Sequence, residues 1–265
     1  MQIKNLIFLI RKILSGVFVK VMLTRVFLLL TVVVSVYGQR IEFPSDDGLA
    51  ITADMYLLEN SEAPFIVLFH QAGWSRGEYL EIAPKLNSLG FSCMAIDQRS
   101  GKSVNDVDNE TAIRAKKEGK PSSYTDAVPD LLAALKYVRY KYSPKTVIGW
   151  GSSYSSALIL KLAGDDPKLV DGILSFAPGE YFEKLGKPSD WITTSARNIS
   201  VPVFITSARE EKPNWINIYN SIKSDKKEMF IPETAGNHGS RALWEKFEDS
   251  ESYWKAVKKF LAQFK

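Results

Sequence analysis

Short apolar runs and longer segments with helical spacing alternate along most of this chain. Short, mostly apolar runs lie at residues 65–69, 91–96, 146–149, 172–176, 202–206 and 228–231. Apolar residues recur at helical spacing over residues 78–89, 124–142, 155–163, 215–222 and 253–264. The short runs are typical of strands buried on both faces, and the periodic segments are typical of helices that cover a sheet. The pattern therefore predicts strands alternating with helices.

Alternating strands and helices favour right-handed βαβ units, which build a mostly parallel central sheet flanked by helices. Residues 40–57 differ, because their apolar positions alternate on both sides of a turn and predict an antiparallel N-terminal hairpin at one edge. Residues 97–123 are polar with little periodicity, which predicts a long loop. Residues 179–200 are too few for a large cap domain. We expect a single α/β domain over residues 39–265.

The N-terminal segment has the features of a targeting signal. Residues 26–36 form an apolar stretch that follows a basic residue and precedes the small residue Gly38. This order is typical of a signal peptide, which we expect over residues 1–38, with residues 1–21 as an upstream extension if Met22 is the start. The protein is then secreted or periplasmic. The alternative is an uncleaved membrane anchor, and membrane contact is expected only through this leader.

Composition and charge exclude several classes of function. The chain is 45% hydrophobic and 24% charged, which is enough apolar material for a core. Its net charge is +4, but residues 1–38 hold five basic residues and no acidic ones, so the remainder has a net charge of −1. That balance gives no electrostatic reason to expect nucleic-acid binding. Cys93 is the only cysteine, which excludes an internal disulfide and a cysteine-based metal cluster.

Candidate chemistry lies directly after the expected strands, where ligands bind in parallel sheets. Gly151-Ser152-Ser153-Tyr154-Ser155 follows one strand and precedes a helix. A sharp strand-to-helix turn with small residues on both sides is typical of a nucleophilic serine, here Ser153. A serine-rich start of a helix is the alternative interpretation of the same residues.

The two residues that would support such a serine follow later strands. His238, flanked by Gly236 and Gly239, follows the last strand and is the candidate general base. An acid that orients this imidazole is expected in Arg209-Glu210-Glu211, where the spacing favours Glu211 and leaves Glu210 as the alternative. The chain order serine, acid, histidine is one of a few that build a catalytic triad.

The remaining candidates concern the oxyanion and the substrate. Backbone N–H groups of Tyr154, and of Gln71 or Ala72 after strand 65–69, could hold a developing oxyanion. Trp74 and Tyr181 are candidates to line a substrate pocket.

Residues 41–264 resemble the α/β-hydrolase superfamily and, within it, the dienelactone-hydrolase-like branch. The resemblance is carried by the motifs FHQAGWSRGEY, AIDQRSGKS, GWGSSYSSA, VPVFITSAREE and AGNHGS. It implies the α/β-hydrolase fold, with Ser153 as nucleophile, Glu211 as acid and His238 as base. It also implies Tyr154 and Gln71 or Ala72 as oxyanion donors, with no metal and no cofactor.

Three departures from the usual motifs narrow this expectation. Ser155 stands where glycine is usual, glutamate stands where aspartate is commoner, and Ser153 stands where dienelactone hydrolases often have cysteine. We therefore expect a carboxylesterase-like serine hydrolase that cleaves a small-molecule ester through an acyl-enzyme. We do not expect dienelactone to be its substrate on the strength of the resemblance. The alternatives are a peptidase or amidase with the same triad, and a non-catalytic binding protein with this fold.

Overall fold

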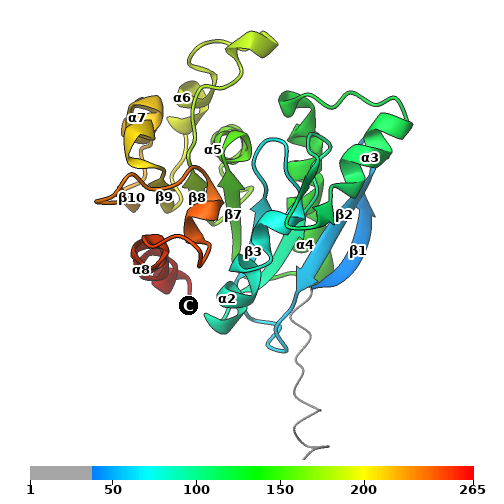
Figure 1. The fold of residues 1–265 in the computed structure, drawn as a ribbon, viewed down its shortest axis with the longest axis horizontal. Coiled ribbons are helices and arrows are strands. Elements are labelled where there is room, and N and C mark those ends of the chain that lie inside the picture. Colours follow the sequence, from blue (N-terminus) through cyan, green and yellow to red (C-terminus); the bar gives the residue numbers. More distant parts are fainter. Residues whose placement is uncertain (1–37) are drawn as a thin grey trace, which may run out of the picture. The chain divides into compact units, whose positions relative to one another are not determined.

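A computed structural model describes residues 38–265, which are built around an eight-stranded sheet (Figure 1). Its strand order is β1-β2-β4-β3-β7-β8-β9-β10. The strands are β1 (Gln39–Pro44), β2 (Ala50–Tyr56), β3 (Phe65–Phe69), β4 (Ser92–Ile96), β7 (Val147–Ser152), β8 (Gly172–Phe176), β9 (Val203–Thr206) and β10 (Lys227–Phe230). Strands β4, β3, β7, β8, β9 and β10 pair in parallel with their neighbours in this order. Strands β1 and β2 form an antiparallel hairpin at one edge, and β2 pairs antiparallel with β4. The predicted α/β fold is confirmed.

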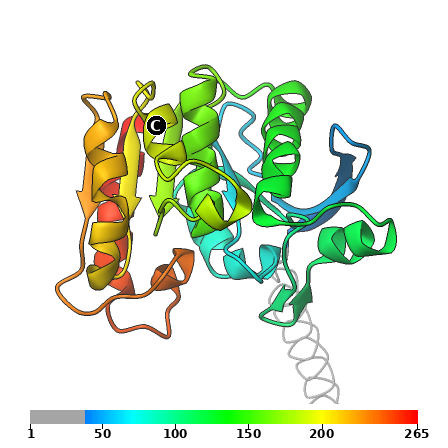
Figure 2. The ribbon, with the colours of Figure 1, turned by 90° about the horizontal axis from the view of Figure 1, so that it is seen from above.

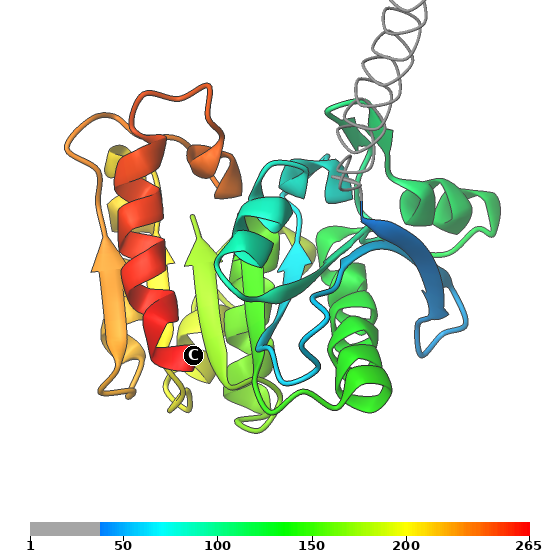
Figure 3. The ribbon, with the colours of Figure 1, turned by 90° about the horizontal axis from the view of Figure 1, so that it is seen from below.

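Helices cover both faces of the sheet. The helices are α2 (Ile82–Ser88), α3 (Glu110–Lys117), α4 (Val128–Tyr142), α5 (Tyr154–Asp165), α6 (Trp191–Ala196), α7 (Lys212–Ser221) and α8 (Ser250–Leu261). Helices α4 to α7 bury their apolar side chains against one face of the sheet. Figure 2 views the molecule from the side on which these helices lie. Helices α2 and α8 pack on the other face, seen in Figure 3. All residues of β3, β4, β7 and β8 are buried, as the short, mostly apolar runs predict.

Short 3-10 turns connect these elements. They are η1 (Arg76–Tyr79), η2 (Tyr124–Ala127), η3 (Glu183–Leu185), η4 (Arg209–Glu211), η5 (Ser240–Leu243) and η6 (Ala262–Phe264). The helix expected over residues 78–89 is therefore divided, and its first residues belong to η1.

The prediction of a long loop over residues 97–123 is wrong. The structure has a two-stranded hairpin there, β5 (Ser103–Val104) with β6 (Val107–Asp108), followed by α3. The Asn109 side chain caps α3 by accepting the Ala112 N–H at 2.8 Å. Because α3 buries only Thr111 and Ala115, it lacks the apolar stripe on which a sequence pattern depends.

Most of the predicted leader, residues 1–37, lies outside the described part of the chain. Within residues 38–265, none of the helices combines the length and hydropathy that spanning a bilayer requires.

Candidate active site

Ser153 lies on a strained turn between β7 and α5. Its φ is 58° and its ψ is −122°, a conformation that residues with a side chain rarely adopt. The turn is held by the Ser153 N–H, which donates to the Phe176 carbonyl at 2.7 Å. It is also tight, because a Cβ on Gly151 would lie 2.4 Å from the Ser156 Cα. These contacts place the Ser153 side chain, 8% exposed, beyond the carboxyl end of β7.

Ser155 occupies the position where related motifs have glycine, and its hydroxyl has a structural task. The buried Oγ lies 2.7 Å from the Phe69 carbonyl and 2.9 Å from the Ser152 carbonyl. It also accepts the Ser152 N–H at 3.0 Å. The hydroxyl therefore joins the turn at Ser153 to the end of the neighbouring strand β3.

His238 and Glu211 form a close pair after the last two strands of the sheet. Glu211 ends η4 after β9, His238 lies in the loop after β10, and Glu211 Oε1 is 2.5 Å from His238 Nδ1. The other carboxylate oxygen accepts the Ala208 N–H at 3.1 Å, which fixes the acid. Glu210 is exposed and forms no hydrogen bond with the described residues. This geometry assigns the imidazole contact to Glu211 and leaves His238 Nε2 available for proton transfer.

The loop that carries His238 rests directly on the turn that carries Ser153. The Ser240 N–H donates to Ser152 Oγ at 2.8 Å. Gly239, which lies between His238 and Ser240 in the chain, has a φ of 71°, and a Cβ there would lie 2.5 Å from the same Ser152 oxygen. Only glycine allows this approach, so the residue beside His238 touches the residue beside Ser153.

Of the two N–H groups expected as oxyanion donors in the loop after β3, that of Gln71 is already engaged. The Gln71 N–H donates to Glu78 Oε2 at 2.7 Å and is therefore engaged. The Ala72 N–H donates to no described residue. Tyr154 opens α5, where a backbone N–H has no acceptor within the helix. The available donors are thus those of Ala72 and Tyr154.

His70 anchors the β3 loop. Its ring is fully buried, with Nδ1 2.8 Å from the Gln71 carbonyl and Nε2 accepting the Gln98 N–H at 3.0 Å. Burial lowers the pKa of His70 to about 4, so the ring is neutral at neutral pH. These contacts leave His238 as the imidazole available for catalysis.

Glu78 is a residue of this region that the sequence pattern did not indicate. Its carboxylate is fully buried and accepts the Ser152 hydroxyl at 2.7 Å as well as the Gln71 N–H. Desolvation raises the pKa of Glu78 to about 7, although these hydrogen bonds and the charge of His238 act to lower it. A glutamate at the start of an expected helix is common on a protein surface, so its type alone gave no signal of burial.

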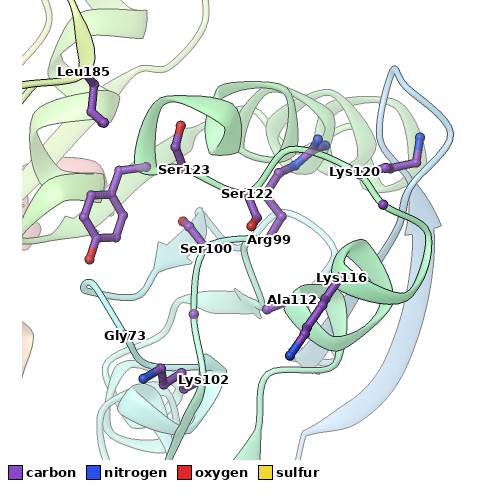
Figure 4. A pocket seen from close by; sticks show the side chains of 13 residues that line it. Gly73, Arg99, Ser100, Lys102, Ala112, Lys116, Lys120, Ser122, Ser123 and Leu185 are labelled. Carbon is purple, nitrogen blue, oxygen red and sulfur yellow. The ribbon is translucent and has the colours of Figure 1, made fainter.

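A pocket of about 590 Å³ is lined mainly by residues between β4 and α4 (Figure 4). Its lining includes Tyr124, whose ring centroid is 4.7 Å from that of Tyr154. Trp74 and Tyr181, the expected lining residues, do not line it: Trp74 stacks on Trp244 at 5.3 Å, and the Tyr181 hydroxyl donates to the Ala177 carbonyl at 2.7 Å. The lining residues are Gly73, Arg99, Ser100, Gly101, Lys102, Ala112, Lys116, Gly119, Lys120, Ser122, Ser123, Tyr124 and Leu185.

The pocket is basic, because four of its lining residues are cationic and none is acidic. Arg99 is neutralised by Asp130 at 2.7 Å and by Asp47. Lys102 and Lys116 form no ion pair with the described residues. Within residues 38–265, no group of His, Cys, Asp and Glu side chains has the arrangement of a metal site.

Comparisons with known proteins agree with this architecture. Residues 61–185 match the family model described as serine aminopeptidase, S33. A search of the curated proteins finds no match.

Several solved structures have a similar fold. The esterase Pf2001 of Pyrococcus furiosus is 18% identical with a TM-score of 0.65, over 86% of this chain and 92% of that one. A dienelactone hydrolase from Anabaena variabilis is 14% identical with a TM-score of 0.63, over 85% and 98%. Est1E from Butyrivibrio proteoclasticus, solved with ferulic acid, is 11% identical with a TM-score of 0.64, over 84% and 98%. By its sheet order, connections and these likenesses, the chain has the α/β-hydrolase fold.

Proposed function

We propose that this protein is a serine hydrolase that cleaves a carboxylic ester of a small molecule. One observation carries the proposal. Glu211 Oε1 lies 2.5 Å from His238 Nδ1, and the loop that carries His238 contacts the strained turn of Ser153 through Ser152. A carboxylate, an imidazole and a serine on a sharp turn are the three groups that nucleophilic acyl transfer requires.

The first half of the reaction forms an acyl-enzyme. His238 Nε2 takes the hydroxyl proton as Ser153 Oγ bonds to the ester carbonyl carbon, and Glu211 stabilises the resulting imidazolium. The N–H groups of Ala72 and Tyr154 donate to the tetrahedral oxyanion. When the carbonyl re-forms, the bond to the alcohol oxygen breaks, and the His238 proton passes to that oxygen. The alcohol then leaves.

The second half regenerates the enzyme. Neutral His238 takes a proton from water, whose oxygen bonds to the acyl carbon. The second tetrahedral intermediate collapses with cleavage of the bond to Ser153 Oγ, which receives the proton back from His238. The carboxylic acid product leaves, and His238 is neutral again.

Amide cleavage is the second candidate. It is favoured by the match of residues 61–185 to a family model named for serine aminopeptidases. The same groups would act on an amide, but an amine is a poorer leaving group than an alcohol, so esters are the first expectation.

Matched p-nitrophenyl esters and p-nitroanilides of graded acyl length test the proposal. We expect saturable hydrolysis of short esters, and loss of kcat by at least about a thousandfold in Ser153→Ala, because the nucleophile is removed. Ser88→Ala, a change at an exposed serine of α2, is the control and should keep wild-type rates. A folded Ser153→Ala variant that keeps most of the activity contradicts the proposal, and faster cleavage of anilides supports the peptidase instead.

A further inference from the structure

Glu78 is a buried carboxylate that takes no direct part in the proposed reaction. Its pKa in the folded protein, about 7, is above its ordinary value of 4.5, because burial disfavours the charged form. A raised pKa of this kind favours folding most below the ordinary value, and that contribution is lost as pH rises through about 7. At neutral and higher pH the ionised carboxylate therefore reduces stability, so stability does not explain its presence. Buried ionisable groups of this type concentrate at functional sites.

The contacts of the Glu78 carboxylate reach three loops of the candidate active site. Oε2 accepts the Gln71 N–H at 2.7 Å, and Oε1 accepts the Ser152 hydroxyl at 2.7 Å. Ser152 Oγ in turn accepts the Ser240 N–H at 2.8 Å.

Each contacted residue is a close chain neighbour of a proposed catalytic group. Gln71 precedes Ala72 and its oxyanion N–H, Ser152 precedes the nucleophile, and Ser240 lies two positions after the base. One carboxylate thus holds the backbone on both sides of the reacting centre.

The ionised form of Glu78 suits these contacts better than the neutral form. Both carboxylate oxygens act as acceptors, one for an N–H and one for a hydroxyl. A protonated carboxyl would donate to Ser152 Oγ, which already accepts the Ser240 N–H, and the Ser152 proton would then lose its acceptor. Protonation therefore disturbs the connection between the loops.

Among the titratable groups that act on Glu78, His238 is the one whose charge changes during the reaction. The others are Tyr79 on η1 and Tyr154 on α5, whose pKa values burial raises, so both stay neutral at neutral pH. The charged residues of the adjoining elements make other contacts: Arg76 of η1 pairs with Asp97 and Asp54, and Arg241 of η5 lies over the Trp74 ring.

We infer that Glu78 is a positioning residue, whose ionised carboxylate fixes the oxyanion loop, the turn of Ser153 and the His238 loop. The inference rests on the proposed function. Glu78 acts through Ser152 and Gln71, and it touches neither the nucleophile nor the substrate.

The pH dependence of ester hydrolysis by Glu78→Gln tests this inference. The glutamine keeps the size of the side chain but removes the charge and one acceptor. We expect kcat on the alkaline plateau to fall on the order of 10-fold to 100-fold with KM little changed. The midpoint of the acid limb of kcat/KM should also move to lower pH, by roughly half a unit or more, because the carboxylate that must be ionised, with a pKa of about 7, is no longer present to titrate.

Two further variants separate positioning from a general structural effect. Glu81→Gln is the matched control: its carboxylate also accepts a backbone N–H, that of Glu245 at 2.9 Å, but is exposed and contacts none of the three loops. It should keep the wild-type profile. Glu78→Asp retains the charge on a shorter side chain, so it should keep the wild-type acid limb even where kcat is reduced.

The outcomes distinguish this inference from the proposed function. If Ser153-dependent hydrolysis is present and Glu78→Gln retains both kcat and the acid limb, the inference is wrong and the proposed function stands. A fall in kcat without movement of the acid limb removes the role of the charge. A wild-type protein without Ser153-dependent hydrolysis contradicts the proposed function, and the inference with it. If Glu78→Gln does not fold, Glu78→Asp provides the test instead. An acid limb that moves in Glu78→Asp by the half unit expected for Glu78→Gln would overturn the role of the charge.

Discussion

Two adjacent glutamates after β9 differ sharply in their surroundings. Glu211 lies against the His238 ring and an amide N–H, whereas Glu210 is exposed. Glu211→Gln should lower kcat for esters by roughly a thousandfold to ten-thousandfold, since an amide N–H facing Nδ1 favours the wrong imidazole tautomer. Glu210→Gln is the matched control and should stay within about twofold of wild type.

Steady-state kinetics on one p-nitrophenyl ester, with melting temperatures measured in parallel, checks this prediction. Equal losses in both variants, or a larger loss in Glu210→Gln, would refute the pairing as the functional one.

The sequence predicts which residues form the candidate site where the chain offers few residues of the required type. The chain has only two histidines, and the small residues around Ser153 indicate a sharp turn. Spacing alone left Glu210 and Glu211 both open, because a side chain's direction after a strand depends on the turn that follows, here η4. Glu78 was not predictable, since its burial depends on Ser152 and Ser240, which lie far from it in the chain.

Among the elements, strands were more predictable than surface helices. The run at residues 172–176 coincides with β8, because a strand buried on both faces is mostly apolar, and Ser175 is the one polar side chain in it. Helix α3 was missed because polar contacts hold it: its N-terminus is capped by Asn109, and the Glu110 N–H donates to Asp97 at 2.8 Å. The omission matters for function, since α3 contributes Lys116 to the basic pocket.

The pocket beside Tyr124 predicts a preference for esters that carry a negative charge. Lys102, in the loop between β4 and β5, and Lys116, on α3, both line it (Figure 4). For a p-nitrophenyl ester with a terminal carboxylate, the double change Lys102→Ala and Lys116→Ala should lower kcat/KM by about 3-fold to 10-fold, as expected for two partly screened charges. The neutral ester of the same length should be unaffected.

Lys117→Ala is the control, because Lys117 follows Lys116 on α3 but does not line this pocket. Raising the salt concentration should reduce the preference of the wild type and leave the double variant unchanged. Equal losses for the charged and the neutral ester would show that the lysines do not read substrate charge.

At the scale of the whole molecule, the sheet brings together groups that are distant in the chain. The parallel strands β3, β7, β9 and β10 end on the same side, so the loops that follow them meet there. This convergence was predictable from alternating strands and helices. The basic pocket was not, because the net charge of −1 over residues 39–265 hides a local concentration of lysines.

The central claim is that Ser153 is a nucleophile activated by His238, and covalent labelling tests it most directly. A fluorophosphonate should phosphonylate the folded protein once, with the adduct found by peptide mass spectrometry on Ser153. His238→Ala, with folding verified, should slow that labelling by at least about a hundredfold, because the base is removed. Folded wild-type protein that stays unlabelled, or that carries the adduct on another serine, would contradict the account.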